Sequence, residues 1–477
     1  MKITMIGHAC IMIETKGLTI LSDPWWRGPC FGAQWWNYPA PCLDPLVGKK
    51  IDYIYISHGH HDHLHPGTLN TLDKDATVIV SDTADLGDFI RGLGFKVLEA
   101  VDGVETQLGV SGVSCRIMAT HGDDTLMVLS DGSEVCANLN DALHSAPRAV
   151  QSAFITRLNA LYPQIDYVFC GYGSASHFPN CYVIPGKDYA ATAAQRQHYF
   201  NEKWARIIAD LRPRWGFPFA ADVAFFEEDL LWANEPTQNT ERPTTAFSAM
   251  YPTSPVHTVD IAPGFVIADG VVLDDRRRQA VSEATLRTDY AAHIARANTL
   301  GTVDALQVDA MRDLVEENVT TCLPYLRSHE SDYRFLIHFK KTDFGIAIVK
   351  QKDEISVISV KLSEIDRSRC NIIFSTRLPY LRWSLTKQYG DEIIFVGSGG
   401  IFEYLRREDA ATNLHRELVV MLRSHPVPPV AVEKKESRLM SNVKKTVKQL
   451  LGRGTEDLYD LDTWTIYGKS HVISRRA

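Results

Sequence analysis

The sequence lacks the features that would place it among disulfide-rich, secreted or membrane proteins. Its nine cysteines are odd in number and contain no C-x-x-C pair, which argues against a disulfide framework and predicts reduced thiols buried in the core. No segment approaches the roughly 18 consecutive apolar residues of a membrane-spanning helix. The first residues, MKITMIGHACIMIETKG, lack the basic and apolar regions of a signal peptide. We therefore predict a cytoplasmic protein with no integral membrane segment.

An excess of basic residues is also missing. The chain has 50 Lys+Arg against 58 Asp+Glu, which gives a formal net charge of -8, so we expect no nucleic acid among its partners. Hydrophobic residues make up 45% of the 477 positions, which is ample for globular cores. A chain of this length exceeds what one core supports, and two domains plus a tail are expected.

The pattern of apolar residues changes along the chain. Short strand-like runs such as KITMIG, CIMIET and DYIYIS mix with helical patterns over residues 1–273, which indicates α/β layers. Residues 274–327 have a helical pattern and predict a helical linker. Period-two strands and amphipathic helices over 328–426 predict a smaller α+β domain. The proline-rich PVPPV segment marks a boundary, and the tail over 427–477 carries a basic amphipathic helix.

The most specific signal is ISHGHHDHLH at residues 56–65, directly after an apolar strand. So many imidazoles in one loop would each need a hydrogen-bond partner, and a bound cation satisfies them together. His58 and His60 are alternate residues and point the same way, whereas Asp62 and His63 lie one turn further on. This geometry separates the ligands into two sets, which predicts a site for two metal ions.

The H-x-H-x-D-H pattern resembles the metallo-β-lactamase superfamily over residues 1 to about 235. The resemblance implies an αββα sandwich with a dinuclear metal site. It also implies two later ligands at strand ends, His121 in THGDD and a metal-bridging Asp141 in NLND. Asp23 matches the family's early Asp-Pro, whose carboxylate orients a ligand histidine from behind.

A finer resemblance is to the metal domain of CMP-N-acetylneuraminate hydroxylases. It rests on GHACIMIE, DPWWRGPCFGAQWW and GSASHFPNCY, and the C-terminal domain is loosely similar to sterol-carrier-like domains. We also predict that His8 and His177 lie behind the ligands or in the pocket, with a hairpin cap as the alternative for His8. Trp25 and Trp36 form either an aromatic core lid or a wall of the substrate pocket, since the loop after Asp23 should lie at the same sheet edge as the metals. Those hydroxylases carry a Rieske iron–sulfur domain, but no C-x-H occurs here. An oxygenase reaction would therefore need an external electron donor.

The last ligand departs from the superfamily pattern, because AADVAFFEEDLLWANE contains no histidine. The hydroxylase resemblance places Glu227 there, with Glu228, Asp222 and His177 as the other candidates. With Glu227, one ion has His58, His60, His121 and Asp141, and the other has Asp62, His63, Asp141 and Glu227. Carboxylate donors favour iron, with zinc or manganese as the alternatives.

Two functions are compatible with such a site. One is an oxygen-activating diiron oxygenase of the hydroxylase type, acting on a nucleotide-linked or other small biosynthetic substrate. The other is a hydrolase of a phosphodiester, lactone or similar bond, in which Asp62 or Asp141 orients the attacking water. A purely structural metal is disfavoured, because structural sites are closed and this motif leaves coordination positions open.

Overall fold

The computed structural model describes residues 1–120, 124–173, 179–239, 241–299, 301–327, 332–387, 390–410 and 414–423. The chain forms two compact units. The first consists of Met1–Ala175 and Ala193–Asn298, and the second of Ser176–Thr192 and the described residues from Thr299 onward. The predicted tail helix lies outside the described residues.

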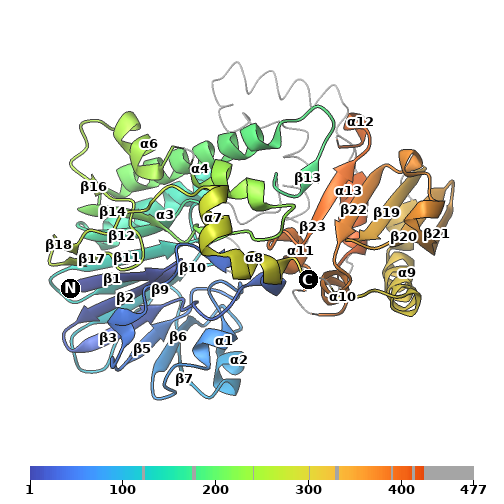
Figure 1. Ribbon diagram of the computed structural model, residues 1–477. Coiled ribbons are helices and arrows are strands. Elements are labelled where there is room, and N and C mark those ends of the chain that lie inside the picture. The colour runs from blue at the N-terminus through green and yellow to red at the C-terminus, as the bar shows by residue number, and fades with distance from the viewer. Residues whose placement is uncertain are drawn as a thin grey trace. The chain divides into compact units, whose positions relative to one another are not determined.

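The first unit is built on two sheets (Figure 1). One sheet has the strand order β18 (Val271–Asp274), β17 (Val266–Ala268), β1 (Lys2–Gly7), β2 (Cys10–Thr15), β3 (Leu18–Ser22), β5 (Tyr53–Tyr55), β6 (Thr77–Ser81), β7 (Lys96–Ala100). The other has the order β16 (His257–Thr258), β14 (Trp215–Phe219), β12 (Tyr167–Gly171), β11 (Val135–Asn140), β10 (Thr125–Ser130), β9 (Ser114–Ala119), β8 (Glu105–Gln107).

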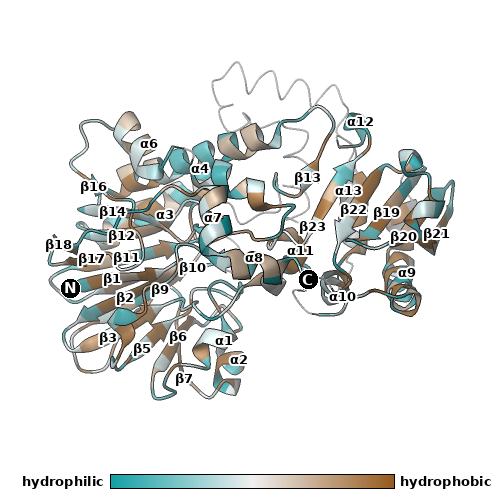
Figure 2. Ribbon diagram, in the orientation of Figure 1, coloured by the Kyte–Doolittle hydropathy of each residue, from teal (hydrophilic) through white to brown (hydrophobic). Residues whose placement is uncertain are grey.

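Hydrophobic residues of both sheets meet in one buried cluster, to which β2 contributes Ile11 and β12 contributes Phe169. A second cluster lies between the β16–β8 sheet and the helices α3 (Arg148–Leu161) and α4 (Tyr189–Leu211). A third packs α1 (Pro66–Leu69) and α2 (Gly87–Gly92) on the other sheet. Figure 2 shows the strands as largely hydrophobic, as expected for sheets buried on both faces. The layers confirm the αββα sandwich.

The second unit confirms a smaller α+β arrangement. Its sheet has the order β13 (Tyr182–Val183), β23 (Gly400–Tyr404), β22 (Ile372–Thr376), β19 (Tyr333–Phe339), β20 (Phe344–Gln351), β21 (Glu354–Lys361). Its helices are α9 (Ala305–Arg327), α10 (Leu378–Thr386), α11 (Glu392–Phe395), α12 (Arg407–Ala410) and α13 (Leu414–Met421).

The two units differ from the predicted boundaries at two places. The short strand β13 pairs with β23, so a segment from within the predicted first domain belongs to the second unit. The predicted linker is divided, because α7 (Glu283–Asp289) and α8 (Ala291–Ala297) belong to the first unit and α9 to the second. The reason is packing: α7 and α8 bury Leu286 and Ile294 in one cluster with Trp36 and Phe226.

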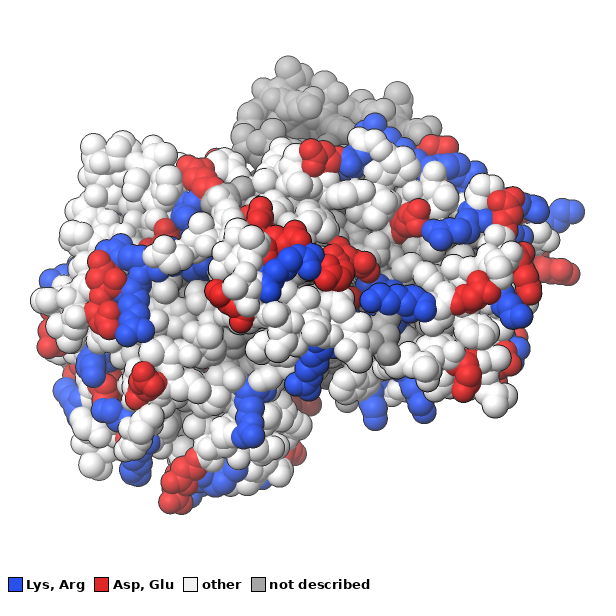
Figure 3. Space-filling model, in the orientation of Figure 1, with Lys and Arg blue, Asp and Glu red and all other residues white. Residues whose placement is uncertain are grey.

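The remaining elements of the first unit are short. They include β4 (Trp36–Asn37), β15 (Val223–Ala224), α5 (Asn234–Gln238) and α6 (Pro243–Met250). In the part of the chain that the structure describes, no helix is long and apolar enough to cross a membrane. All nine cysteines lie in this part without a disulfide, and all but Cys42 are buried, which confirms the prediction of core thiols. Basic and acidic side chains are interspersed on the face drawn in Figure 3.

Candidate metal centre

The histidine loop follows β5 at an edge of the first sheet where several other polar residues meet. β3 and β5 run parallel, so their carboxyl ends meet at the same edge and Asp23, after β3, lies beside Ser57, after β5. The turn between β1 and β2 brings His8 there. Asp141 follows the end of β11 and contacts His63. Strand ends thus converge on the loop from both sheets.

The described residues contain three groups of side chains whose metal-ligating atoms lie within 4.8 Å of one another. Between them these groups include four histidines and three aspartates. The groups are His8, Asp62 and His63; His58, His60 and Asp124; and His58, His63 and Asp141. The predicted ligands of the histidine loop are therefore brought together, and so is Asp141.

His63 lies at the centre of this arrangement. Its Nδ1 is 2.9 Å from Oδ2 of Asp23, which is fully buried and also accepts hydrogen bonds from Ser57. Its Nε2 lies 3.4 Å from Oδ2 of Asp62 and 3.6 Å from Oδ2 of Asp141. A histidine with a carboxylate behind it and its other nitrogen facing further carboxylates is the usual arrangement of a metal-bound imidazole.

Two buried atoms of this arrangement have no hydrogen-bond partner: Nε2 of His63 and Oδ1 of Asp141. Buried polar atoms are nearly always satisfied, and an unsatisfied one calls for a missing water or ion. Two ligand atoms that each bind one ion at about 2.1 Å are roughly 3 to 3.5 Å apart, close to the separations around His63. The donor set present therefore fits a metal ion.

The second part of the site includes a residue that sequence reasoning missed. Nε2 of His58 lies 2.7 Å from Nδ1 of His60 and 3.7 Å from Oδ1 of Asp124. Asp124 belongs to the same THGDD segment as the predicted ligand His121, which lies outside the described residues. The two adjacent aspartates of THGDD were the feature of the sequence from which Asp124 could have been predicted as a ligand.

Burial and charge act in opposite directions in the cluster. Burial would raise the pKa of Asp62, but the neighbouring His63 and His8 outweigh it and hold the pKa well below its usual range. The pKa of Asp141 is also lowered, since His63 outweighs the effect of burial. For His58, burial lowers the pKa, and His63 and His60 lower it further. For His63 the carboxylates of Asp62 and Asp23 outweigh burial and raise the pKa well above its usual value. The metal-free site thus combines ionised carboxylates, a neutral His58 and a protonated His63, whose proton a metal ion would displace.

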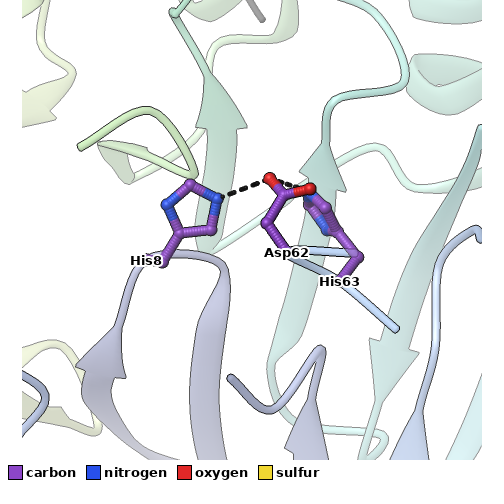
Figure 4. Close-up of side chains that lie close together, drawn as sticks. All are labelled: His8, Asp62 and His63. Atoms are coloured by element: carbon purple, nitrogen blue, oxygen red, sulfur yellow. Dashed lines mark hydrogen bonds and ion pairs between the residues drawn. The ribbon is translucent and has the colours of Figure 1, made fainter. Parts of the chain in front are cut away.

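Figure 4 shows His8 and His63 on either side of the Asp62 carboxylate. Nε2 of His8 lies 3.0 Å from Oδ2 of Asp62. Trp25 is fully buried and packs edge-on against His8, with ring centroids 5.2 Å apart. Trp36 packs instead against His293 of α8, at a centroid distance of 4.7 Å. Trp25 therefore contacts the cluster directly, whereas Trp36 packs against His293 and Phe226.

Two other residues bear on the predicted ligand set. His144 was not considered from the sequence, yet its Nδ1 lies 3.0 Å from the backbone oxygen of Asp141, where it supports the turn after β11. The feature of the sequence that could have indicated this role was the position of His144, three residues after the candidate ligand Asp141. His177, the alternative last ligand, lies outside the described residues.

Glu227 is buried, and its Oε1 accepts a hydrogen bond of 2.8 Å from Nε2 of Gln34. It is not a member of the three groups found among the described residues. The hydrogen bond connects the segment after β15 to the aromatic loop before β4. A ligand role for Glu227 stays a prediction from the sequence.

We expect Glu227→Ala to lower thermal stability whether or not the carboxylate also binds a metal ion. Removing the carboxylate leaves the buried Gln34 amide without its acceptor, which costs about 1–3 kcal/mol. Metal analysis and thermal unfolding of Glu227→Ala and Glu227→His check this. Loss of a metal ion in the alanine variant, or a shift from iron to zinc in the histidine variant, would establish the ligand role predicted from the sequence.

Comparison with known proteins agrees with the geometry. Residues 2–133 match the family model described as a beta-lactamase superfamily domain. The N-terminal part of the chain is therefore similar to the beta-lactamase superfamily. The matched region contains His8, Asp23, the histidine loop and Asp124, whereas Asp141 lies beyond it.

The relatives of the chain include proteins with different names. A Mycobacterium tuberculosis protein named as a Rieske 2Fe-2S iron-sulfur protein is 30% identical over 248 residues, which cover 49% of this chain and 46% of that protein. The chain thus spans about half the length of this relative. The cytidine monophosphate-N-acetylneuraminic acid hydroxylase of Asterias rubens is 44% identical over 89 residues, covering 17% of this chain and 13% of the hydroxylase.

Solved structures also resemble the chain. A metallo hydrolase from Ignicoccus hospitalis is 18% identical, with a TM-score of 0.39, and the match covers 56% of this chain and 97% of the hydrolase.

Proposed function

We propose that the cluster binds two divalent metal ions, iron in preference to zinc or manganese, and that the protein is an oxygen-activating oxygenase of the hydroxylase type. Its substrate would be a nucleotide-linked or other small biosynthetic molecule. The observation that carries the metal proposal is a pair of buried ligand atoms that make no hydrogen bond, Nε2 of His63 and Oδ1 of Asp141, in a cluster of histidines and aspartates.

The residues of the chain have distinct tasks in this proposal. His58, His60 and Asp124 would hold one ion, and Asp62 and His63 the other, with Asp141 shared between them and His121 completing the first set. Asp23 fixes His63 through Nδ1, so that Nε2 remains available for the ion. When bound, two iron ions would supply the redox chemistry that dioxygen requires.

Two observations support the oxygenase. The donor set includes several carboxylates beside the histidines, and hard oxygen donors shift such a site away from zinc and toward iron or manganese. The chain also resembles a cytidine monophosphate-N-acetylneuraminic acid hydroxylase at 44% identity over a short stretch. The sequence contains no C-x-H motif for a Rieske cluster, so we propose that electrons come from a separate donor.

The second candidate is a metal-dependent hydrolase of a phosphodiester, lactone or similar bond. The same absence of a Rieske motif favours it, because hydrolysis needs no electron donor. In this case Asp62 or Asp141 would orient a water molecule for attack. Both candidates use the same ligands and differ in the metal that they need.

Metal analysis of anaerobically purified protein distinguishes the two. The oxygenase predicts about two iron ions per chain, as in diiron sites, and consumption of dioxygen once the iron is chemically reduced. Bound zinc, no dioxygen uptake and cleavage of bis-p-nitrophenyl phosphate or a simple lactone would establish the hydrolase. Protein that binds neither metal under any condition would contradict the proposed site itself.

A further inference from the structure

The ring of His8 is held by oxygen atoms at both nitrogens. Nε2 faces Oδ2 of Asp62 at 3.0 Å, and Nδ1 faces the backbone oxygen of Asp222 at 3.3 Å. The backbones also meet, because the N–H of Ala220 donates to the backbone oxygen of His8 at 3.2 Å. The turn after β14 therefore holds His8 at its ring and at its backbone.

This turn is unusual in its own conformation. Ala220 has φ 54 and His8 has φ 48, and side chains rarely adopt these left-handed values without support from their surroundings. Two residues with left-handed backbone conformations, His8 and Ala220, are thus hydrogen-bonded to each other next to Asp62. Something must hold the turn at residues 220–222 in place.

The side chain of Asp222 provides this support. Its Oδ1 accepts a hydrogen bond of 2.8 Å from the hydroxyl of Tyr172, and its Oδ2 lies 3.1 Å from Nε of Arg278. Arg242 donates to the same tyrosine hydroxyl at 2.8 Å. The Arg278 side chain is 2% exposed and lies over the ring of Tyr38. Residues from three other segments, Tyr172, Arg242 and Arg278, therefore hold this carboxylate.

The charges of this group reinforce the clamp. Burial would raise the pKa of Asp222, but the guanidinium groups of Arg278 and Arg242 outweigh it and keep the pKa below its usual value. A charged, hydrogen-bonded carboxylate held by two arginines has little freedom to move. The backbone carbonyl of the same residue is held with it.

We propose that Asp222, clamped by Tyr172 and Arg278, is a positioning residue of the metal centre. Its carbonyl orients His8, and His8 orients the carboxylate of Asp62. Asp222 was considered from the sequence only as a substitute ligand, and this role is different, because its carboxylate faces the arginines. The inference rests on the proposed metal site.

The test is a double-mutant cycle on cobalt binding by the metal-free full-length protein. We expect Asp222→Asn and His8→Ala each to weaken cobalt affinity by about 10-fold, the lower end for residues behind metal ligands, and to shift the visible absorption of bound cobalt. In the His8→Ala background, Asp222→Asn should cause no further loss, because its effect passes through His8. Tyr172→Phe, which removes only the hydroxyl, should change the spectrum in the same direction and replaces Asp222→Asn if that variant does not fold.

Asp131→Asn is the matched control. Asp131 is a buried aspartate of the same unit that accepts a hydrogen bond from Thr15, and its loss should lower thermal stability without altering the cobalt spectrum. Equal effects of Asp222→Asn with and without His8, or an unchanged spectrum in Asp222→Asn and Tyr172→Phe, would overturn the positioning role. Failure of the wild type to bind cobalt, iron or zinc would instead contradict the proposed function.

Discussion

His63→Ala is expected to lose its bound metal and with it the activity. His63 belongs to two of the three ligand groups, so its removal takes a ligand from the ion that it would share with Asp62 and leaves Asp23 buried without that partner. The loss of metal affinity should exceed the roughly 10- to 100-fold that is typical for a residue behind the ligands. Elemental analysis after dialysis, together with chelator competition, measures it.

His198→Ala is the control for this experiment. His198 lies on α4, its side chain is 49% exposed, and it pairs with Glu202 and Glu241. Its replacement should leave the metal content unchanged. A His63→Ala protein with the metal content of the wild type would contradict the assignment of the metal site.

Asp23→Asn is expected to weaken metal binding by about 10- to 100-fold while the fold is retained. The Asp23 carboxylate accepts hydrogen bonds from the backbone and hydroxyl of Ser57 and contacts Nδ1 of His63. An asparagine turns one acceptor into an NH2 group, which must face a donor. His63 then loses the negative charge that orients it. The NH2 group of the asparagine is left buried against another donor, which lowers stability by about 1–3 kcal/mol.

Asp52→Asn is a suitable comparison, because its carboxylate also accepts from a backbone N–H, that of Thr19, beside the same strands. Competition with a chelator should show wild-type affinity in Asp52→Asn and a clear loss in Asp23→Asn. Equal affinity in both variants would remove Asp23 from the metal centre.

The ligands closest together in the chain could be predicted from the sequence. His58, His60, Asp62 and His63 lie within one loop after a strand, and their local spacing determines which way they point. Asp141 and Asp23 followed from the resemblance to the metallo-β-lactamase superfamily, since each directly follows a strand. The αββα layers likewise followed from strand and helix patterns together with that resemblance.

Contacts between distant segments could not be predicted in this way. Asp124 joins His58 only because β5 and β10 come from two sheets packed on one core. The hydrogen bond between Gln34 and Glu227 joins residues 193 positions apart in the chain. The sequence could suggest Glu227 as a ligand from its residue type, but it could not predict this hydrogen bond.

The sequence by itself determined which residue types could bind metal, because spacing within one loop is a local property of the backbone. Only the tertiary structure decided which residues hold these ligands in position. His8 meets Asp222 across 214 positions, and the tyrosine and arginines that hold Asp222 come from three further segments. The physical reason is that a carboxylate can be clamped by any donor the fold brings within hydrogen-bond distance, and local periodicity carries no information about which donor that is.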